Sequence, residues 1–182
     1  MDGLLSQSRI LNSSIFGGGA SVIRNIQRGE VEVTALTHNV TISATSTSDY
    51  VARVSLKRTT STNGAKAHMV RAHLTTSTNL RLTREDDDGS VFVSWEVIEF
   101  QSVKSVQSGL TTVAASEVTN VTINSVNMAK SLVFVSYSHS NLTTAGENRA
   151  MTLKHRLTSS TNLELDIDLN TASPQWFVVE FY

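Results

Sequence analysis

The chain has 182 residues, a formal net charge of −1 and no cysteine, which excludes a disulfide framework, a thiolate metal site and a general attraction to nucleic acid. No apolar run approaches the roughly 18 residues of a membrane span, so neither a membrane nor a nucleic acid is an expected partner. Serine and threonine account for 47 residues and proline for one, which favours regular antiparallel sheet because threonine suits the pleated strand.

Residues 1–22 are predicted to form an extended N-terminal docking arm. Large apolar residues are scattered here among polar ones, and the glycine triplet 17–19 follows them. The apolar set is Leu4, Leu5, Ile10, Leu11, Ile15 and Phe16. The segment lacks the basic start and continuous apolar core of a signal peptide, so we expect no cleaved signal. Because these six side chains have no domain of their own to be buried in, we expect them to bind another subunit or another protein.

Beyond the arm, the chain alternates polar and apolar residues in short segments. The segment 30–34 (EVEVT) shows the pattern, which is typical of half-buried antiparallel strands. The segments with this pattern are 30–34, 39–43, 53–57, 80–84, 90–100, 120–124, 131–136, 162–169 and 176–181. Turn-rich stretches separate them and no convincing helical stretch occurs, so the pattern predicts an all-β protein.

One set of motifs occurs twice, displaced by 80 to 83 residues. The matches are 23–29 (IRNIQRG) with 103–109 (VKSVQSG), 40–42 (VTI) with 121–123 (VTI), 74–80 (LTTSTNL) with 157–163 (LTSSTNL), and 95–100 (WEVIEF) with 176–181 (WFVVEF). Polar residues that could carry chemistry do not match: His73 aligns with Arg156, and the acidic run 86–88 has no counterpart. A duplicated fold without duplicated chemistry favours a structural or binding protein.

The fold class predicted from these patterns is two tandem homologous antiparallel β-sandwiches behind the arm. The first repeat covers residues 23–102 and the second covers 103–182, with five or six strands in each. The closing segment 90–100 holds most of the aromatic mass, in Phe92, Trp95 and Phe100, and is expected to be central in its sheet. Five pairs of positions are expected to be buried equivalently: Val40/Val121, Ile42/Ile123, Val54/Val135, Leu80/Leu163 and Trp95/Trp176.

The acidic run Asp86, Asp87 and Asp88 is the strongest candidate for an ion site. Calcium uses such carboxylates, but it needs about six to eight oxygen ligands, usually from more than one segment. The second repeat has 170–173 (NTAS) at this place, which argues against a shared ion site. We therefore interpret the run as a solvated hairpin tip and predict no metal.

Catalytic patterns are absent from the sequence. His68 and His73 are five residues apart, so on one strand they would point to opposite faces and not share a metal. The five histidines are interpreted as surface or interface residues: His38, His68, His73, His139 and His155. There is no GxSxG motif, and the glycine triplet lacks the Lys-Ser/Thr pair of a phosphate loop. We predict no enzymatic activity, no catalytic residue and no cofactor.

Taken together, the motifs Ile/Val-x-x-Ile/Val-Gln-x-Gly, Val-Thr-Ile, Ala-Lys-Ser, Leu-Thr-Ser-Ser-Thr-Asn-Leu and Trp-x-Val-Val-Glu-Phe resemble a small β-domain of tailed-bacteriophage virion proteins, which often occurs in tandem. The resemblance covers residues 23–182. The second copy keeps it better, with 128–131 (MAKS) where the first has 48–51 (SDYV). More distantly, six strands that end in an aromatic-rich strand are similar to the H-type lectin sandwich, a trimeric sugar-binding fold.

The resemblance implies a non-enzymatic virion component, assembled in the host bacterial cytoplasm. We expect a homotrimeric tail-fibre, collar or other appendage protein, which docks through its arm to other virion proteins of the portal, neck, tail or capsid. The alternatives are a head decoration (capsid cement) protein and a lectin-like adhesin for host glycan. The adhesin reading has few candidate aromatic side chains beyond Tyr50 and Tyr137, and fold analogy alone does not establish sugar binding.

Overall fold

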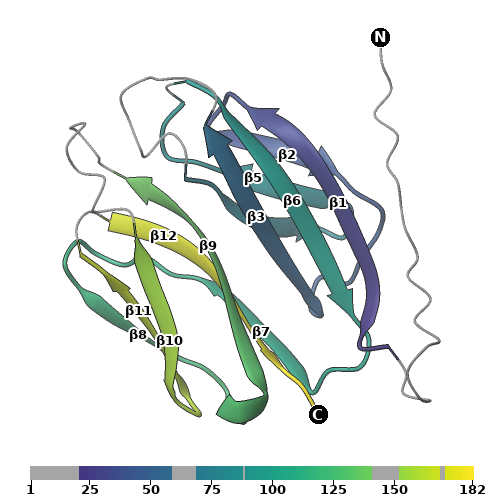
Figure 1. Cartoon of the computed structure of the whole chain (residues 1–182), viewed down its shortest axis with the longest axis vertical. Coiled ribbons are helices and arrows are strands. Elements are labelled where there is room, and N and C mark those ends of the chain that lie inside the picture. Colours follow the sequence, from purple (N-terminus) through teal and green to yellow (C-terminus); the bar gives the residue numbers. More distant parts are fainter. Residues whose placement is uncertain (1–20, 59–68, 88, 141–151, 169–170) are drawn as a thin grey trace.

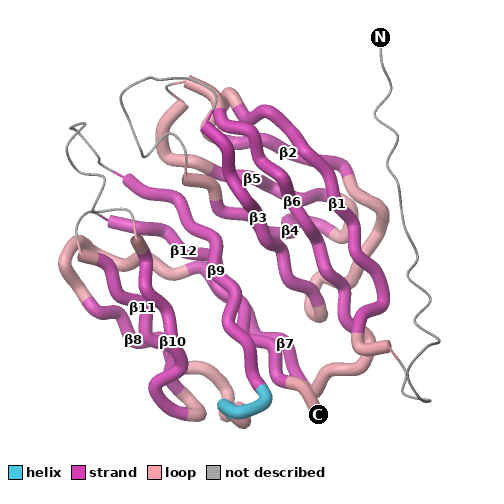
Figure 2. The backbone as a smooth tube through the Cα atoms, viewed as in Figure 1, coloured by secondary structure: helices cyan, strands magenta, loops and turns pink. Residues whose placement is uncertain are grey.

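The computed structural model describes residues 21–58, 69–87, 89–140, 152–168 and 171–182. The described residues form strands and connecting loops, apart from the short 3-10 segment Met128–Lys130, which is cyan in Figure 2. Most of the predicted arm, with its six large apolar residues, lies outside the described residues. The all-β class predicted from the alternation is confirmed.

Twelve strands follow one another along the described chain. The strands are β1 (Ile23–Val33), β2 (Thr37–Thr41), β3 (Tyr50–Arg58), β4 (Arg71–Thr76), β5 (Asn79–Thr83), β6 (Val91–Phe100), β7 (Ser105–Leu110), β8 (Val118–Thr122), β9 (Ser131–Ser140), β10 (Leu153–Ser159), β11 (Asn162–Ile167) and β12 (Thr171–Glu180). Six belong to each sequence repeat, which is the upper end of the predicted number.

The strands form four antiparallel sheets of three, two in each repeat (Figure 1). In the first repeat the orders are β1-β6-β3 and β2-β5-β4, and in the second they are β7-β12-β9 and β8-β11-β10. Numbered within each repeat, both orders are 1-6-3 and 2-5-4, so the duplicated motifs specify the same strand order twice. The closing strands β6 and β12 are central in their sheets, as the aromatic pattern predicted.

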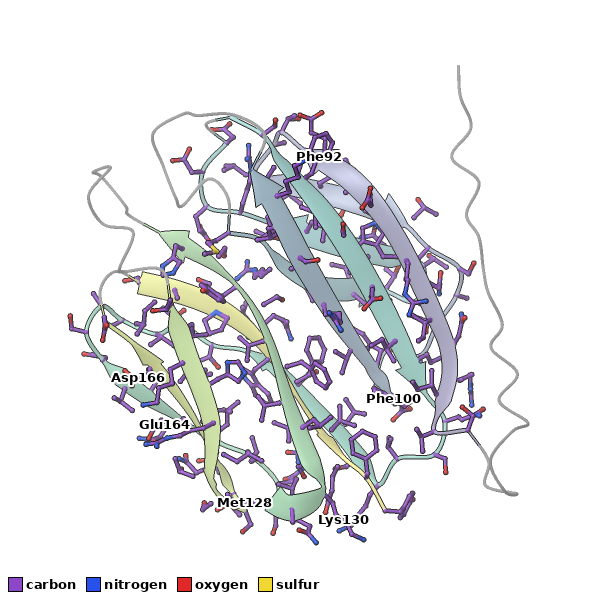
Figure 3. The ribbon with its side chains drawn as sticks, in the orientation of Figure 1. Phe92, Phe100, Met128, Lys130, Glu164 and Asp166 are labelled. Atoms are coloured by element: carbon purple, nitrogen blue, oxygen red, sulfur yellow. The ribbon has the colours of Figure 1, made fainter. Side chains whose placement is uncertain are left out.

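The core of each sandwich lies between its two sheets. Of the five position pairs expected inside, three are buried in both repeats: Ile42/Ile123, Leu80/Leu163 and Trp95/Trp176. The pairs Val40/Val121 and Val54/Val135 are also equivalent, but all four valines are only partly buried. Phe92 differs from its aromatic neighbours, because it lies on the opposite face of β6 from Trp95 and is 45% exposed (Figure 3).

The two sandwiches pack directly on each other and share apolar side chains. The sheet β7-β12-β9 turns its outer face towards the edge strands β3 and β4 of the first sandwich. Phe177 and Val179 of β12 are fully buried there, within the core cluster of the first repeat. The Phe177 ring meets Tyr50 edge-on with ring centres 5.3 Å apart, and Phe181 meets Phe100 at 6.3 Å. The tandem sandwiches are therefore one packed body.

Strand register corrects the sequence alignment of one motif. Ser131 pairs with Glu180 on β12, just as Tyr50 pairs with Glu99 on β6. The segment 128–131 therefore corresponds to 47–50, one residue earlier than the alignment with 48–51 had placed it. A one-residue slip matters in a strand because it moves every side chain to the other face of the sheet.

Candidate interaction surfaces

The duplicated polar residues hold each sandwich together. Gln27 accepts a hydrogen bond from the Ser43 N–H (2.7 Å) and donates one to the Ser43 carbonyl (2.9 Å). Gln107 makes the same pair of bonds with Asn124, at 2.7 and 3.1 Å. The glutamine of the repeated Gln-x-Gly motif therefore fastens the loop after β2 or β8 to the first strand of its repeat.

The glycine of that motif makes room for the tryptophan of the closing strand. A Cβ atom at Gly29 would lie 2.5 Å from Cζ2 of Trp95, and one at Gly109 would lie 2.5 Å from Cζ2 of Trp176. No real Cβ contact is that short, so a larger residue would force the indole to move. The Gln-x-Gly and Trp motifs are therefore two halves of one packing contact.

The glutamate of the closing Glu-Phe motif is a buried loop anchor in both repeats. Glu99 accepts a hydrogen bond from the Ser46 N–H at 3.0 Å. Glu180 accepts one from the Asn127 N–H at 2.8 Å and pairs with Lys104 Nζ at 2.8 Å. The bond from Lys104, followed by the one from Asn127, holds the pKa of Glu180 below its ordinary value. The sequence motif alone indicates no role for this glutamate.

Protonation of Glu180 at low pH should weaken this anchor, and the variant Glu180→Gln should show how much the carboxylate stabilises the fold. A carboxyl whose pKa is lowered on folding stabilises the protein above its unfolded pKa, near 4.3, and loses that contribution as pH falls through the folded pKa. We expect Glu180→Gln to unfold at lower urea concentration than wild type at pH 7, with the difference shrinking below about pH 4. Urea unfolding at pH 7 and pH 3 measures this. The control is Glu117→Gln, at an exposed glutamate. If Glu180→Gln were less stable than wild type by the same amount at both pH values, the charge of Glu180 would not be what stabilises the fold.

The acidic run lies between a buried arginine and a glycine whose carbonyl group this arginine binds. The Arg84 side chain is 1% exposed and donates to the carbonyl oxygens of Thr34 (2.9 Å), Ala35 (3.2 Å) and Gly89 (2.8 Å). Gly89 has a positive φ of 72°, a conformation that glycine adopts without strain. Asp88 lies outside the described residues. Among those described, no group of three His, Asp or Glu side chains is arranged to hold a metal.

The histidines do not gather at one site. His139 is fully buried beside Tyr137, with ring centres 5.2 Å apart, so its interpretation as a surface or interface residue is wrong. His68 lies outside the described residues, whereas His73 on β4 is half-buried and His155 on β10 is exposed. Burial, together with the charges of Arg71 and Arg81, lowers the pKa of His73.

A shallow groove of about 410 Å³ crosses the outer face of the sheet β1-β6-β3. Its floor carries Glu96 between two arginines: Arg28 Nε lies 2.5 Å from one carboxylate oxygen, and Arg53 Nε lies 3.2 Å from the other. Both arginine side chains are about half exposed, so these ion pairs add little stability. The groove therefore offers two guanidinium groups as hydrogen-bond donors, and both are already partly engaged by the Glu96 carboxylate.

The tyrosines considered for sugar stacking are not both available at the surface. Tyr50 is 5% exposed at the contact between the sandwiches, where its hydroxyl accepts a hydrogen bond from the Leu74 N–H at 3.1 Å. Burial raises the pKa of Tyr50. Tyr137 is half-buried beside His139. Tyr50 thus acts in packing, and the adhesin alternative loses one of its two aromatic candidates.

The contact between the sandwiches had a sequence signal that alternation alone missed. The segment 176–179 (WFVV) is a continuous apolar run, whereas its counterpart 95–98 is WEVI. A continuous run is typical of a strand that is buried on both faces. Phe177 and Phe134 take the places of Glu96 and Arg53, so the same sheet face is apolar in the second repeat and charged in the first.

Neither known families nor individual proteins identify the chain. Comparison with protein families, with curated proteins and with solved structures finds no match. Within the described residues, no helix has the length and apolar character needed to cross a membrane.

Proposed function

We propose that this chain is a non-enzymatic structural component of a tailed-bacteriophage virion, a homotrimeric tail-fibre or collar-type appendage that attaches through its N-terminal arm. The observation that carries the proposal is the use of the duplicated polar side chains. Gln27/Gln107 and Glu99/Glu180 all bind backbone groups of their own repeat. The polar side chains that the two copies share therefore maintain the fold, which is expected of a protein that serves as a building block of an assembly.

The packing between the sandwiches supports the same role. Two units of about 80 residues are each near the lower size limit for an independent core. Here Phe177 and Val179 of the second repeat complete the core of the first. A double module with a shared core has a fixed shape, which suits a spacer or projection that must keep its geometry on a particle. The phage assignment itself rests on the motif resemblance described above.

Removing the arm should separate folding from assembly. Deletion of residues 2–16 is expected to leave the sandwiches folded and to abolish incorporation into the particle, because the arm holds an apolar set outside both repeats. Thermal unfolding of the purified variant and its copy number in purified particles measure the two effects. A variant with serine at the six apolar positions keeps the length of the arm and should fail in the same way.

The outcome also separates the alternatives. Incorporation at normal occupancy without the arm would mean that attachment runs through the sandwich faces, as in a head decoration protein, and would overturn the appendage proposal. Binding of the intact chain to host glycans on an array, lost when Arg28 and Arg53 are replaced by alanine, would instead favour the adhesin and place its site in the groove.

A further inference from the structure

The two sandwiches have the same open flank, and only one is covered. In the first repeat the β3–β4 flank is closed over by the second sandwich, and its inward side chains are at most 9% exposed. These side chains are Ala52, Val70, Ala72 and Leu74. In the second repeat we call the corresponding residues the β9–β10 flank: Val133, Leu153, His155 and Leu157. Here the three apolar side chains are only half-buried and His155 is exposed.

On the covered flank, side chains accept hydrogen bonds from the backbone N–H groups at the edge of β4. Two N–H groups of β4 point away from β5 and donate hydrogen bonds to side-chain oxygens, not to a neighbouring strand. The Ala72 N–H donates to Ser136 Oγ of the second sandwich at 3.0 Å, and the Leu74 N–H donates to the Tyr50 hydroxyl at 3.1 Å. Both the apolar surface and the backbone of this edge therefore have partners.

The β9–β10 flank has less cover of both kinds within the described chain. Only at Leu153 do side chains bind its backbone edge, where the Tyr137 hydroxyl and the His155 ring each form a hydrogen bond with the main chain. His155 and Leu157 occupy the register positions of Ala72 and Leu74, so their N–H groups point away from β11. Ser131 stands where the first repeat has Tyr50, which removes the phenol that would reach Leu157. No described residue accepts a hydrogen bond from either N–H group. An edge of this kind is a template for an added strand.

A second copy cannot cover this flank by repeating the packing between the sandwiches. That packing inserts Phe177 and Phe134, but the equivalent face of the first sandwich presents Glu96 and Arg53. Burying this ion-paired network against valine and leucine would remove charged groups from water without new partners. The charged face thus ends the series of stacked sandwiches.

Direct pairing of two β10 strands is also disfavoured. Antiparallel pairing centred on His155 would set Lys154 of one copy opposite Arg156 of the other, and like charges opposite each other destabilise a sheet. Each cation is already paired within its own sheet, Lys154 with Asp166 at 3.1 Å and Arg156 with Glu164 at 2.6 Å. Figure 3 shows both carboxylates at the outer side of the second sandwich, away from the first.

We propose that the β9–β10 flank binds the N-terminal arm of a second copy of this chain as an added strand beside β10. The arm can supply what the flank lacks, because its six large apolar residues belong to neither sequence repeat and its main chain has the N–H and C=O groups of an added strand. Added beside β10, it would bury Leu153 and Leu157 and supply acceptors for the two N–H groups. The inference rests on the homotrimer of the proposed function, and it identifies the contact between the subunits of that trimer.

The point at which the arm joins the first sandwich favours exchange between copies. The chain enters the first sandwich at Ser21, whose carbonyl accepts a hydrogen bond from Gln101 Nε2 at 2.8 Å. Figure 1 shows β1 and β10 at opposite sides of the molecule, so the arm joins the first sandwich far from the flank of its own chain. Twenty residues span roughly 70 Å when extended, which is enough to reach a neighbouring subunit. Each subunit then gives one arm and receives one, which closes a ring under threefold symmetry.

Amide hydrogen exchange of the full chain by NMR tests the proposal, with the first repeat as internal control. We expect the His155 and Leu157 amides to exchange at least tenfold more slowly at high concentration, where light scattering reports the oligomer, than at a dilution that gives monomer. The Ala72 and Leu74 amides, bonded within the chain, should not respond to dilution. Serine at the six apolar arm positions should remove the protection at 155 and 157 only.

Protection at 155 and 157 that is absent, independent of concentration or unchanged by the serine arm would overturn the proposal. So would a chain that stays monomeric at every concentration. A second variant reads the flank itself: Leu157→Asp should dissociate the oligomer, whereas Leu110→Asp, at an exposed apolar residue of β7, should not. An oligomer that survives Leu157→Asp would refute this contact and leave the homotrimer of the proposed function standing.

Discussion

Replacing Trp176 with alanine is expected to lower the free energy of unfolding by about 3–5 kcal/mol. The indole is 8% exposed and belongs to the core of the second sandwich. It lies against Gly109, which has no side chain to fill the space that the indole would leave. Its Nε1–H also donates to Thr111 Oγ1 at 3.0 Å. A loss of this size is a large part of the stability of such a domain. Chemical unfolding followed by circular dichroism measures it.

Two further variants divide this effect into its parts. Trp176→Phe keeps most of the ring volume but leaves Thr111 without its donor, and should cost less than the alanine variant. Phe92→Ala is the surface control, because Phe92 lies on a closing strand but is 45% exposed, and its cost should stay below about 1 kcal/mol. Equal losses for Phe92→Ala and Trp176→Ala would show that the strand faces are assigned the wrong way round.

The second large effect is expected at the contact between the sandwiches. Phe177→Glu places in the second repeat the residue that the first repeat has at the same position. We expect a loss of at least about 4 kcal/mol, because an unpaired carboxylate would be buried against Tyr50 in a fully covered site. Scanning calorimetry should then show two transitions in place of one, since the shared core joins the repeats into one cooperative unit.

The matched control is the same position in the first repeat. Glu96 is 27% exposed in its side chain and lies between two half-exposed arginines, so Glu96→Ala should change stability by about 1 kcal/mol or less. A single sharp transition in Phe177→Glu, with stability close to wild type, would mean that the sandwiches do not depend on this contact. Phe177→Leu should retain most of the stability, because it keeps the site apolar.

Much of the fold could be predicted because it depends on patterns among neighbouring residues in the sequence. The period of two marked the strands, and the repeat showed that the same unit is built twice. The closing segments were expected to be central because they concentrate the aromatic side chains of each repeat. The roles of Gln27 and Glu99 could not be predicted, since the bonds they make join loops and strands that the sequence does not place together.

The candidate sites also include features that could be predicted from the sequence and features that could not. The acidic run 86–88 was visible from the sequence, but the burial of Arg84 beside it was not, because that side chain binds carbonyl groups about 50 residues away. The arm residues could be recognised as an apolar set without a domain. The flank that we propose for them was invisible, because Leu153 and Leu157 look like ordinary core residues until the cover over their counterparts is seen.

By itself, the sequence determined an all-β chain of two like sandwiches, because alternation, turn residues and repetition act over a few neighbouring residues. Only the tertiary structure decided how the two copies differ in use. Phe177 and Glu96 occupy the same position in the same fold, yet one completes a neighbouring core and the other faces solvent. That difference arises from packing between strands far apart in the chain, and it leaves one flank covered and the other open.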